Sequence, residues 1–197
     1  MSIVVCHGGS ASSPANKDGP ERACLAGLEI IARQEGALEA AMIYARLAVF
    51  LRANYPVAQV LVGRILESHQ HWEMAIDVYK GVVAKSDYAW DAELGIAASL
   101  QRLKRYDDAI ILLDKMAKRQ SKRTDSLVAL GNLYRSRERW REAVSQYDKA
   151  VKRVPNLGTA TWTLLYARGI ALERAKEWKR AESDFLRALE LRPDQPL

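Results

Sequence analysis

Small and large apolar residues recur in a fixed order along most of this chain. Three alanines lie 34 residues apart, and a fourth follows after a further 38. An aromatic residue stands three positions before each alanine, a large apolar residue stands four positions after it, and a small residue lies upstream in the same register. The four series are Gly63, Ala97, Gly131 and Gly169; Trp72, Tyr106, Trp140 and Trp178; Ala75, Ala109, Ala143 and Ala181; and Tyr79, Leu113, Tyr147 and Phe185.

This order predicts pairs of antiparallel helices. A Gly or Ala on the first helix allows a close approach, the Ala of the second helix fits against it, and the large residues fill the space beside them. The second helix of each pair is expected to begin at the repeated aromatic residue. Pro155 and Pro193 stand where second helices should stop, because proline cannot continue a helix without losing a hydrogen bond.

The register divides the chain into segments of unequal regularity. The leader 1–21 contains the small, polar stretch SASSPANKDGP and is expected to be flexible. Residues 22–55 hold another apolar helical pair, but Leu38 and Glu29 occupy its aromatic and small positions, so we interpret it as a degenerate or N-capping hairpin. The other segments are the units 56–89, 90–123, 124–157 and 162–195, the inserted junction 158–161, and the tail 196–197. We therefore expect an all-α fold of about five hairpins and ten helices.

The composition agrees with stacked helices. A hydrophobic share of 49% is ample for a core, and only 6 prolines and 11 glycines interrupt 197 residues. The charge of +6, from 30 bases and 24 acids, allows an anionic partner without indicating one. No stretch approaches the ~18 uncharged apolar residues of a membrane span, so no membrane insertion is expected. Cys6 and Cys24 form no paired motif, which favours a reducing, cytoplasmic location; the periplasm is the alternative if a signal sequence is missing from this chain.

The residues that could carry chemistry form no recognised site. His69 and His71 lie two positions apart in a turn, His7 lies in the leader, and no Cys or carboxylate cluster completes a metal site at a known spacing. The sequence also contains no phosphate-binding loop, nucleophile elbow, HExxH motif or dinucleotide fingerprint. We therefore expect a protein without enzymatic activity, cofactor or metal.

The repeat pattern resembles that of the tetratricopeptide repeat family, with its 34-residue period. Unit 124–157 matches best, whereas unit 90–123 is degenerate, with Glu93, Met116 and Ser121 where a large apolar residue, Ala and Pro are usual. The matching residues are Leu127, Leu130, Gly131, Tyr134, Ala143, Tyr147, Ala150 and Pro155, followed in the last unit by Gly169, Ala181, Phe185, Ala188 and Pro193. The resemblance covers residues 22–197 and implies a right-handed α-solenoid. In detail, the sequence is similar to the middle part of longer alphaproteobacterial members of the family, whose function is unassigned.

The resemblance also implies a binding groove along the inner faces of the first helices. The expected groove residues are Val57, Val60, Arg64, Asp91, Leu94, Arg102, Val128, Asn132, Tyr166 and Ile170. They mix apolar anchors with a few polar groups, which suits a partner helix or extended peptide, and they lack the basic clamp that relatives use for the acidic tails of chaperones. In the alternative interpretation, Val60, Leu94 and Val128 only support neighbouring helices.

Two further surfaces offer alternative functions. The turns inside the hairpins should line up as a basic edge that could bind a nucleic acid or another acidic partner, although interleaved acids favour a plain solvated edge. The residues of the basic edge are Arg105, Arg135, Arg137, Arg139, Arg141, Lys176 and Lys179. The last hairpin is followed by no polar capping helix, which predicts either a fragment of a longer repeat protein or a homo-oligomer formed through this hairpin.

Overall fold

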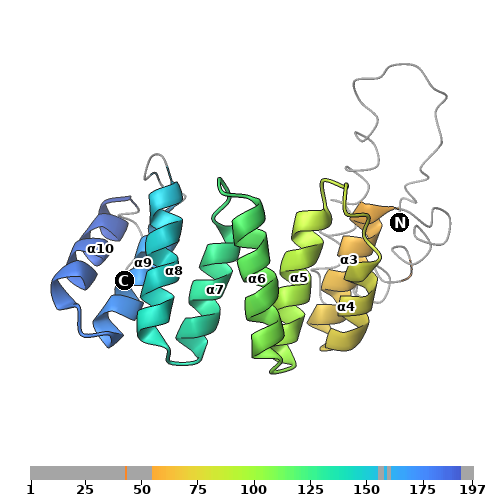
Figure 1. Cartoon of the computed structure of the whole chain (residues 1–197), viewed down its shortest axis with the longest axis horizontal. Helices are drawn as coiled ribbons and strands as arrows, with labels where there is room; N and C mark the ends of the chain where they lie inside the picture. Colours follow the sequence, from red (N-terminus) through yellow and green to blue (C-terminus); the bar gives the residue numbers. More distant parts are fainter. Residues whose placement is uncertain (1–42, 44–54, 155–157, 159–160, 192–197) are drawn as a thin grey trace, which may run out of the picture. The chain divides into compact units, whose positions relative to one another are not determined.

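The computed structural model describes residues 43, 55–154, 158 and 161–191. Within them the chain forms eight helices and no strand (Figure 1). The helices are α3 (Pro56–Ser68), α4 (Trp72–Lys80), α5 (Ala89–Arg102), α6 (Tyr106–Arg119), α7 (Asp125–Ser136), α8 (Trp140–Arg153), α9 (Trp162–Arg174) and α10 (Trp178–Leu191). The expected leader 1–21, nearly all of the expected hairpin 22–55, and both Pro155 and Pro193 lie outside the described residues.

The predicted helix starts are confirmed. The second helices α4, α6, α8 and α10 begin at the four repeated aromatic residues, and the first helices α3, α5, α7 and α9 begin within a residue of the expected boundaries. The predicted fold class is confirmed as well: helices pack in chain order as antiparallel pairs, without any sheet among the described residues.

The chain forms two compact units, Met1–Gly95 and Ile96–Leu197, whose boundary falls within α5. In the N-terminal unit, α3 packs against α4 around Tyr79, which is 2% exposed. A Cβ atom added at Gly63 or at Gly95 would overlap the Tyr79 ring, so the ring fills the space that these two glycines leave. Helix α4 ends early, at Lys80, where Gly81 and the β-branched Val82 interrupt it.

The C-terminal unit repeats the same packing twice. Within hairpins α7 packs on α8 and α9 on α10, and between hairpins α6 packs on α7 and α8 on α9. A Cβ atom at Gly131 would overlap the ring of Tyr147, and one at Gly169 would overlap the ring of Phe185. The pairing of small and large residues that was expected from their spacing is therefore present in the core.

The turns inside the four hairpins share one backbone design. In each, one residue has a left-handed backbone with φ between 58° and 65°, and its N–H and the next one bond back to carbonyls of the first helix. In the α7–α8 turn, for example, the Glu138 N–H bonds to the Arg135 carbonyl at 3.0 Å and the Arg139 N–H to the Tyr134 carbonyl at 2.9 Å. This is the Schellman motif, in which glycine is usual at the left-handed position. Here that position is held by Gln70, Lys104, Glu138 and Lys176.

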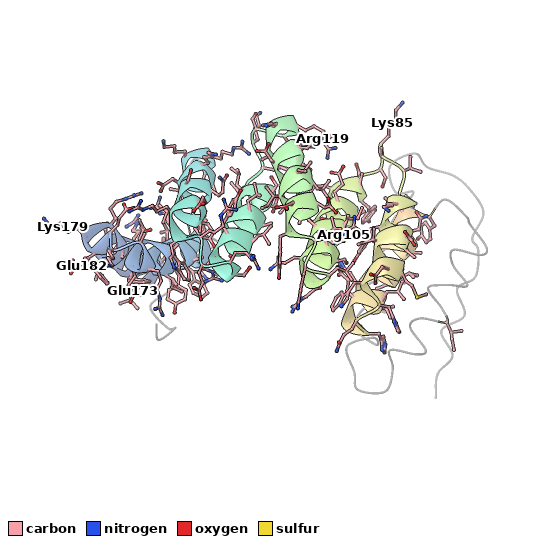
Figure 2. The ribbon with its side chains drawn as sticks, turned by 60° about the horizontal axis from the view of Figure 1, so that its bottom comes forward. Lys85, Arg105, Arg119, Glu173, Lys179 and Glu182 are labelled. Carbon is pink, nitrogen blue, oxygen red and sulfur yellow. The ribbon has the colours of Figure 1, made fainter. Side chains whose placement is uncertain are left out.

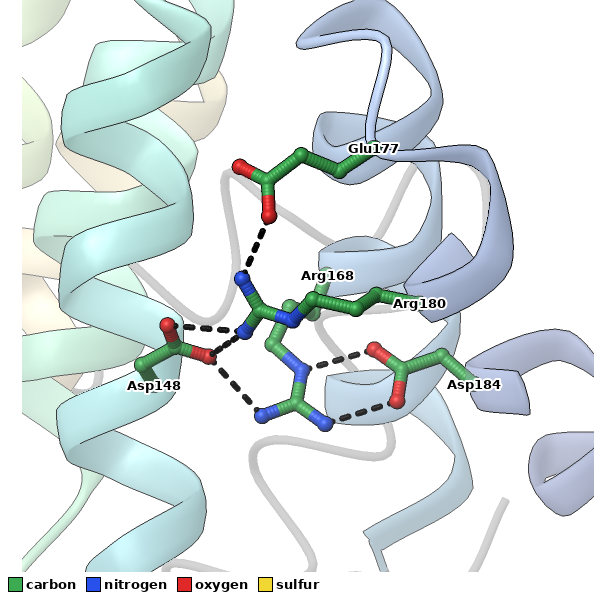
Figure 3. A network of polar contacts seen from close by, with 5 residues as sticks. All are labelled: Asp148, Arg168, Glu177, Arg180 and Asp184. Carbon is green, nitrogen blue, oxygen red and sulfur yellow. Dashed lines mark hydrogen bonds and ion pairs between the residues drawn. The ribbon is translucent and has the colours of Figure 1, made fainter. Parts of the chain in front are cut away.

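A buried ionic network joins α8, α9 and α10 (Figure 3). Arg168 of α9 donates two hydrogen bonds of 2.6 Å to Asp184 of α10 and one of 3.0 Å to Asp148 of α8. Asp148 also accepts hydrogen bonds from Arg180, which in turn binds Glu177 at 2.6 Å. The hydrogen bonds from Arg168 to Asp184 raise the pKa of Arg168 against the opposing effect of burial. Arg168 thus fixes the last hairpin to the one before it.

Candidate functional site

Four of the expected groove residues belong to α7 and α9 of the C-terminal unit. These two first helices contact each other, and Tyr166 and Ile170 of α9 occupy the positions in the repeat that Val128 and Asn132 hold in α7. Val128, Tyr166 and Ile170 are half-buried and Asn132 is exposed. Half-buried apolar side chains on adjacent helices can gain contact area when a ligand covers them.

Two contacts hold the groove side chains in place. The Tyr147 hydroxyl donates a 2.7 Å hydrogen bond to Asn132 Oδ1, which leaves the Asn132 NH₂ group as the one available to a ligand. Burial raises the pKa of Tyr147 to about 12, so this hydroxyl keeps its proton near neutrality. The Tyr166 ring lies 5.8 Å from the Phe185 ring and 6.4 Å from the Trp162 ring, within an aromatic cluster. The Asn132 amide and the Tyr166 ring are therefore held in place by their own neighbours.

Arg102 is the expected groove residue on the part of α5 that belongs to the C-terminal unit. It is exposed in the last turn of α5, next to Gln101, whose Nε2 lies 3.5 Å from the Ser136 hydroxyl of α7. The Ser136 hydroxyl itself donates to the Leu133 carbonyl at 2.8 Å. This link joins the C-terminal ends of α5 and α7.

The expected groove residues of the N-terminal unit differ in their exposure to solvent. Arg64 is exposed, whereas Val57, Asp91 and Leu94 are half-buried. Val60 is only 4% exposed and packs in the interior. The alternative interpretation, in which such residues support neighbouring helices, therefore holds for Val60, which has no surface to offer a ligand.

The basic edge of the C-terminal unit is partly neutralised by its own acids. Arg105 pairs with Asp108 at 2.7 Å and Arg139 pairs with Glu142 at 2.9 Å, each three positions along the helix. Hydrogen bonds from its own backbone N–H and from Arg139 lower the pKa of Glu142. The expected self-neutralisation is confirmed for these two arginines.

The remaining members of the edge are placed less uniformly. Arg137, Arg141, Lys176 and Lys179 are exposed, while Arg135 is half-buried in the last turn of α7. Figure 2 shows Arg105 and Arg119 at opposite ends of α6, so the cations of the α6–α7 connection do not extend this edge. The same view labels Glu173, in the last turn of α9, and Lys179, in the first turn of α10, so an acid and a base flank the α9–α10 turn.

One inference about the repeated tryptophans needs correction. Their period assigned all of them to packing, and Trp72 and Trp140 are half-buried as expected. Trp178 is 61% exposed, because it lies on the side of α10 on which no helix packs in the described part of the chain. The described residues contain no group of three or more His, Cys, Asp or Glu side chains placed to hold a metal ion. Among the same residues, no helix has the length and apolar character of a membrane span.

Comparisons with known proteins support the repeat assignment. Residues 128–196 match the tetratricopeptide repeat family. No curated protein matches the chain in sequence.

Several solved structures share the fold at low sequence identity. MamA residues 41 to the end from Desulfovibrio magneticus RS-1 is 20% identical, with a TM-score of 0.64 over 91% of this chain and 99% of that one. TTC0263, a thermophilic tetratricopeptide repeat protein of Thermus thermophilus, is 15% identical, with a TM-score of 0.69 over 89% and 93%. YrrB, described as a tetratricopeptide repeat protein with an unusual peptide-binding site, is 17% identical, with a TM-score of 0.57 over 89% and 87%. Residues 128–196 thus match the tetratricopeptide repeat family, and the described helices share the fold of the solved tetratricopeptide repeat proteins.

Proposed function

We propose that this protein is a non-enzymatic adaptor that binds a peptide or helix of a protein partner along α7 and α9. The observation that carries the proposal is the surface formed by Val128, Tyr166 and Ile170 beside the oriented amide of Asn132. Burial of apolar side chains would supply affinity, and the amide would fix the direction and register of the bound backbone.

The fold supports this class of function. Tetratricopeptide repeats generally mediate protein–protein interactions, and YrrB, with the same fold, is described as having a peptide-binding site. An extended peptide or a single helix suits a surface made by two neighbouring helices, because either ligand can present side chains at regular intervals to both.

A pair of matched substitutions tests the groove. Ile170→Asp places a charge in the proposed groove, and Ile111→Asp places the same charge on α6, where the side chain is already 68% exposed. Partners captured by affinity purification and identified by mass spectrometry should be lost with Ile170→Asp and kept with Ile111→Asp. Arg102→Glu, at an exposed groove position, repeats the test without altering apolar packing.

Thermal unfolding of each variant separates loss of binding from loss of the fold. The proposal fails if a folded Ile170→Asp variant and a folded Arg102→Glu variant both keep every partner of the unmodified protein. It also fails if Ile111→Asp removes the same partners as Ile170→Asp, since the groove would then have no special role.

A second candidate function, self-assembly, has one observation in its favour. Trp178, Leu186 and Leu189 are 61%, 57% and 38% exposed and follow one face of α10 at helical spacing. We expect sedimentation velocity to show a species larger than a monomer at high concentration, and Leu186→Glu to abolish it. A monomeric mass at every concentration would rule this function out.

A further inference from the structure

A cavity of about 320 Å³ opens in the C-terminal unit between two of the turns inside hairpins. Its floor includes Leu133, which is 1% exposed, and Ile110. The rings of Tyr106, at the start of α6, and Tyr134, in α7, line it as well. This volume lies at the lower end of the range for ligand pockets, so it suits one or two side chains and not a folded surface.

Two arginines lie over the faces of these tyrosine rings. The guanidinium carbon of Arg137 lies 4.3 Å from the ring centre of Tyr106, which belongs to the neighbouring turn, and that of Arg139 lies 4.8 Å from the ring centre of Tyr134. The N–H groups of a guanidinium lie in its own plane, so a guanidinium held over a ring can still donate them to a ligand. The stacking therefore holds donor groups at the cavity before a ligand binds.

The lining carries an excess of positive charge. Lys104, Arg105, Arg137 and Arg139 supply four cations, whereas Asp107 and Asp108 supply two carboxylates. Arg105 is neutralised by Asp108, and Arg139 by Glu142. Arg137 and Lys104 make no ion pair within the described residues, and both are exposed. In this part of the described chain, the cations without an ion pair are thus Arg137 and Lys104, and they outnumber the one lining carboxylate that has none, Asp107.

The repeat itself does not require these residues. At the equivalent positions of the next hairpin, Leu172 replaces Tyr134, Ala175 replaces Arg137 and Glu177 replaces Arg139. Leu172 is fully buried, which shows that an aliphatic residue meets the packing needs of this position. The preceding hairpin has Leu100 and Leu103 at the positions of Tyr134 and Arg137, so this tyrosine and this arginine are particular to the junction, whereas Arg139 has a counterpart in Arg105.

We propose that this cavity binds the carboxylate side chain of an acidic peptide segment. Arg137 and Lys104 contact the carboxylate, and the rings of Tyr106 and Tyr134 cover the methylene groups that precede it. Asp107 remains as an acceptor for a backbone N–H of the peptide. The same carboxylate disfavours a nucleic acid, whose phosphates follow one another along the backbone and would be repelled by Asp107.

This site goes beyond the groove on α7 and α9, because it lies at the turns and selects for charge. A partner with an apolar segment and a nearby acidic residue could engage both surfaces. The two sites can be tested separately, because none of the expected groove residues lines the cavity.

Fluorescence anisotropy with the full chain tests the proposal. The probes are a short labelled peptide that alternates Glu with Leu, the same peptide with Gln in place of Glu, and single-stranded oligothymidylate. We expect the Glu peptide to bind at least tenfold more tightly than the Gln peptide and than oligothymidylate. Arg137→Ala should weaken binding of the Glu peptide at least tenfold.

Arg141→Ala is the matched control, because Arg141 is an exposed arginine of the same edge that does not line the cavity. It should change the affinity less than twofold. Arg137→Lys keeps the positive charge but loses the contact of the guanidinium with the Tyr106 ring. Its affinity for the Glu peptide should therefore lie between those of Arg137→Ala and the unmodified protein. Equal losses for Arg137→Ala and Arg141→Ala would overturn the proposal, because they would show a diffuse effect of charge. Equal affinity for the Glu and Gln peptides, or tighter binding of oligothymidylate, would overturn it as well.

Discussion

Replacement of Arg168 by methionine should destabilise the C-terminal unit strongly. Methionine keeps much of the apolar stem but removes the guanidinium, whose side chain is only 15% exposed and bridges three helices. Asp184, whose side chain is 8% exposed, then loses both hydrogen bonds of its bidentate pair. A carboxylate left buried without its partner costs free energy, because neither water nor protein compensates its charge.

The magnitude follows from which carboxylate is left without a partner. Asp148 is 29% exposed and keeps Arg180 at 2.8 Å, so its contribution to the loss should be small. Asp184 has no such substitute in the network, and breaking a buried pair of this kind costs about 3 to 5 kcal/mol. We expect about 3 kcal/mol for Arg168→Met. Arg180→Met should cost at most about 1 kcal/mol, since the Arg180 side chain is 49% exposed.

Urea unfolding followed by circular dichroism measures these changes, and a double substitution tests their cause. Arg168→Met combined with Asp184→Leu removes the buried charge as well as its partner, and should recover to within about 1 kcal/mol of the original stability. The reasoning is refuted if Arg168→Met costs no more than Arg180→Met. It is refuted equally if the double variant is as unstable as Arg168→Met alone.

Three further predictions follow from the packing and the turns. Gly131→Ala should lower the melting temperature, at a cost of about 1 to 3 kcal/mol, because its Cβ overlaps the Tyr147 ring, whereas Gly158→Ala meets no atom within 4 Å and should change little. The neutral form of Tyr147 is favoured in the folded state by its raised pKa of about 12, so stability should be intact below pH 10 and fall between pH 10 and 12. In Tyr147→Phe, the free energy of unfolding measured as a function of pH should fall by about 2 to 3 kcal/mol less between pH 10 and 12 than in the unmodified protein. Lys176→Gly, at φ 65°, should raise the urea midpoint by relieving about 1 kcal/mol of backbone strain, whereas Ala175→Gly, at φ −78°, should lower it; the opposite order would contradict the strain argument.

The helices could be predicted from the sequence because the small and large residues that pack against each other recur at a fixed spacing. Gly131 and Tyr147 stand in series that repeat along the chain, and the structure places each glycine of the series against its aromatic partner. The starts of the second helices followed from the same register. The groove side chains on α7 and α9 come from the same register and stay a prediction.

Other features left no periodic trace. Arg168 occupies the position that Leu130 holds in the preceding unit, so the spacing alone indicated an apolar contact, and its two partners come from helices on either side. The left-handed turns contain no glycine that would have marked them. The stack of Arg137 on Tyr106 joins two turns and depends on how neighbouring hairpins pack. Arg168 and Arg137 each stood out as an unusual residue at a repeated position, but the residues that they contact could be found only in three dimensions.

The uniform turns have a consequence for how such a chain can change its length. The connections inside hairpins always span the same interval, 69–71, 103–105, 137–139 and 175–177, and their hydrogen bonds come from the main chain. The connections between hairpins vary, from 81–88 after α4 to 120–124 after α6. Insertions and deletions are thus tolerated between hairpins and penalised within them. A gene duplication or recombination that respects whole hairpins would preserve every turn, which makes the hairpin the natural module for gain or loss of repeats.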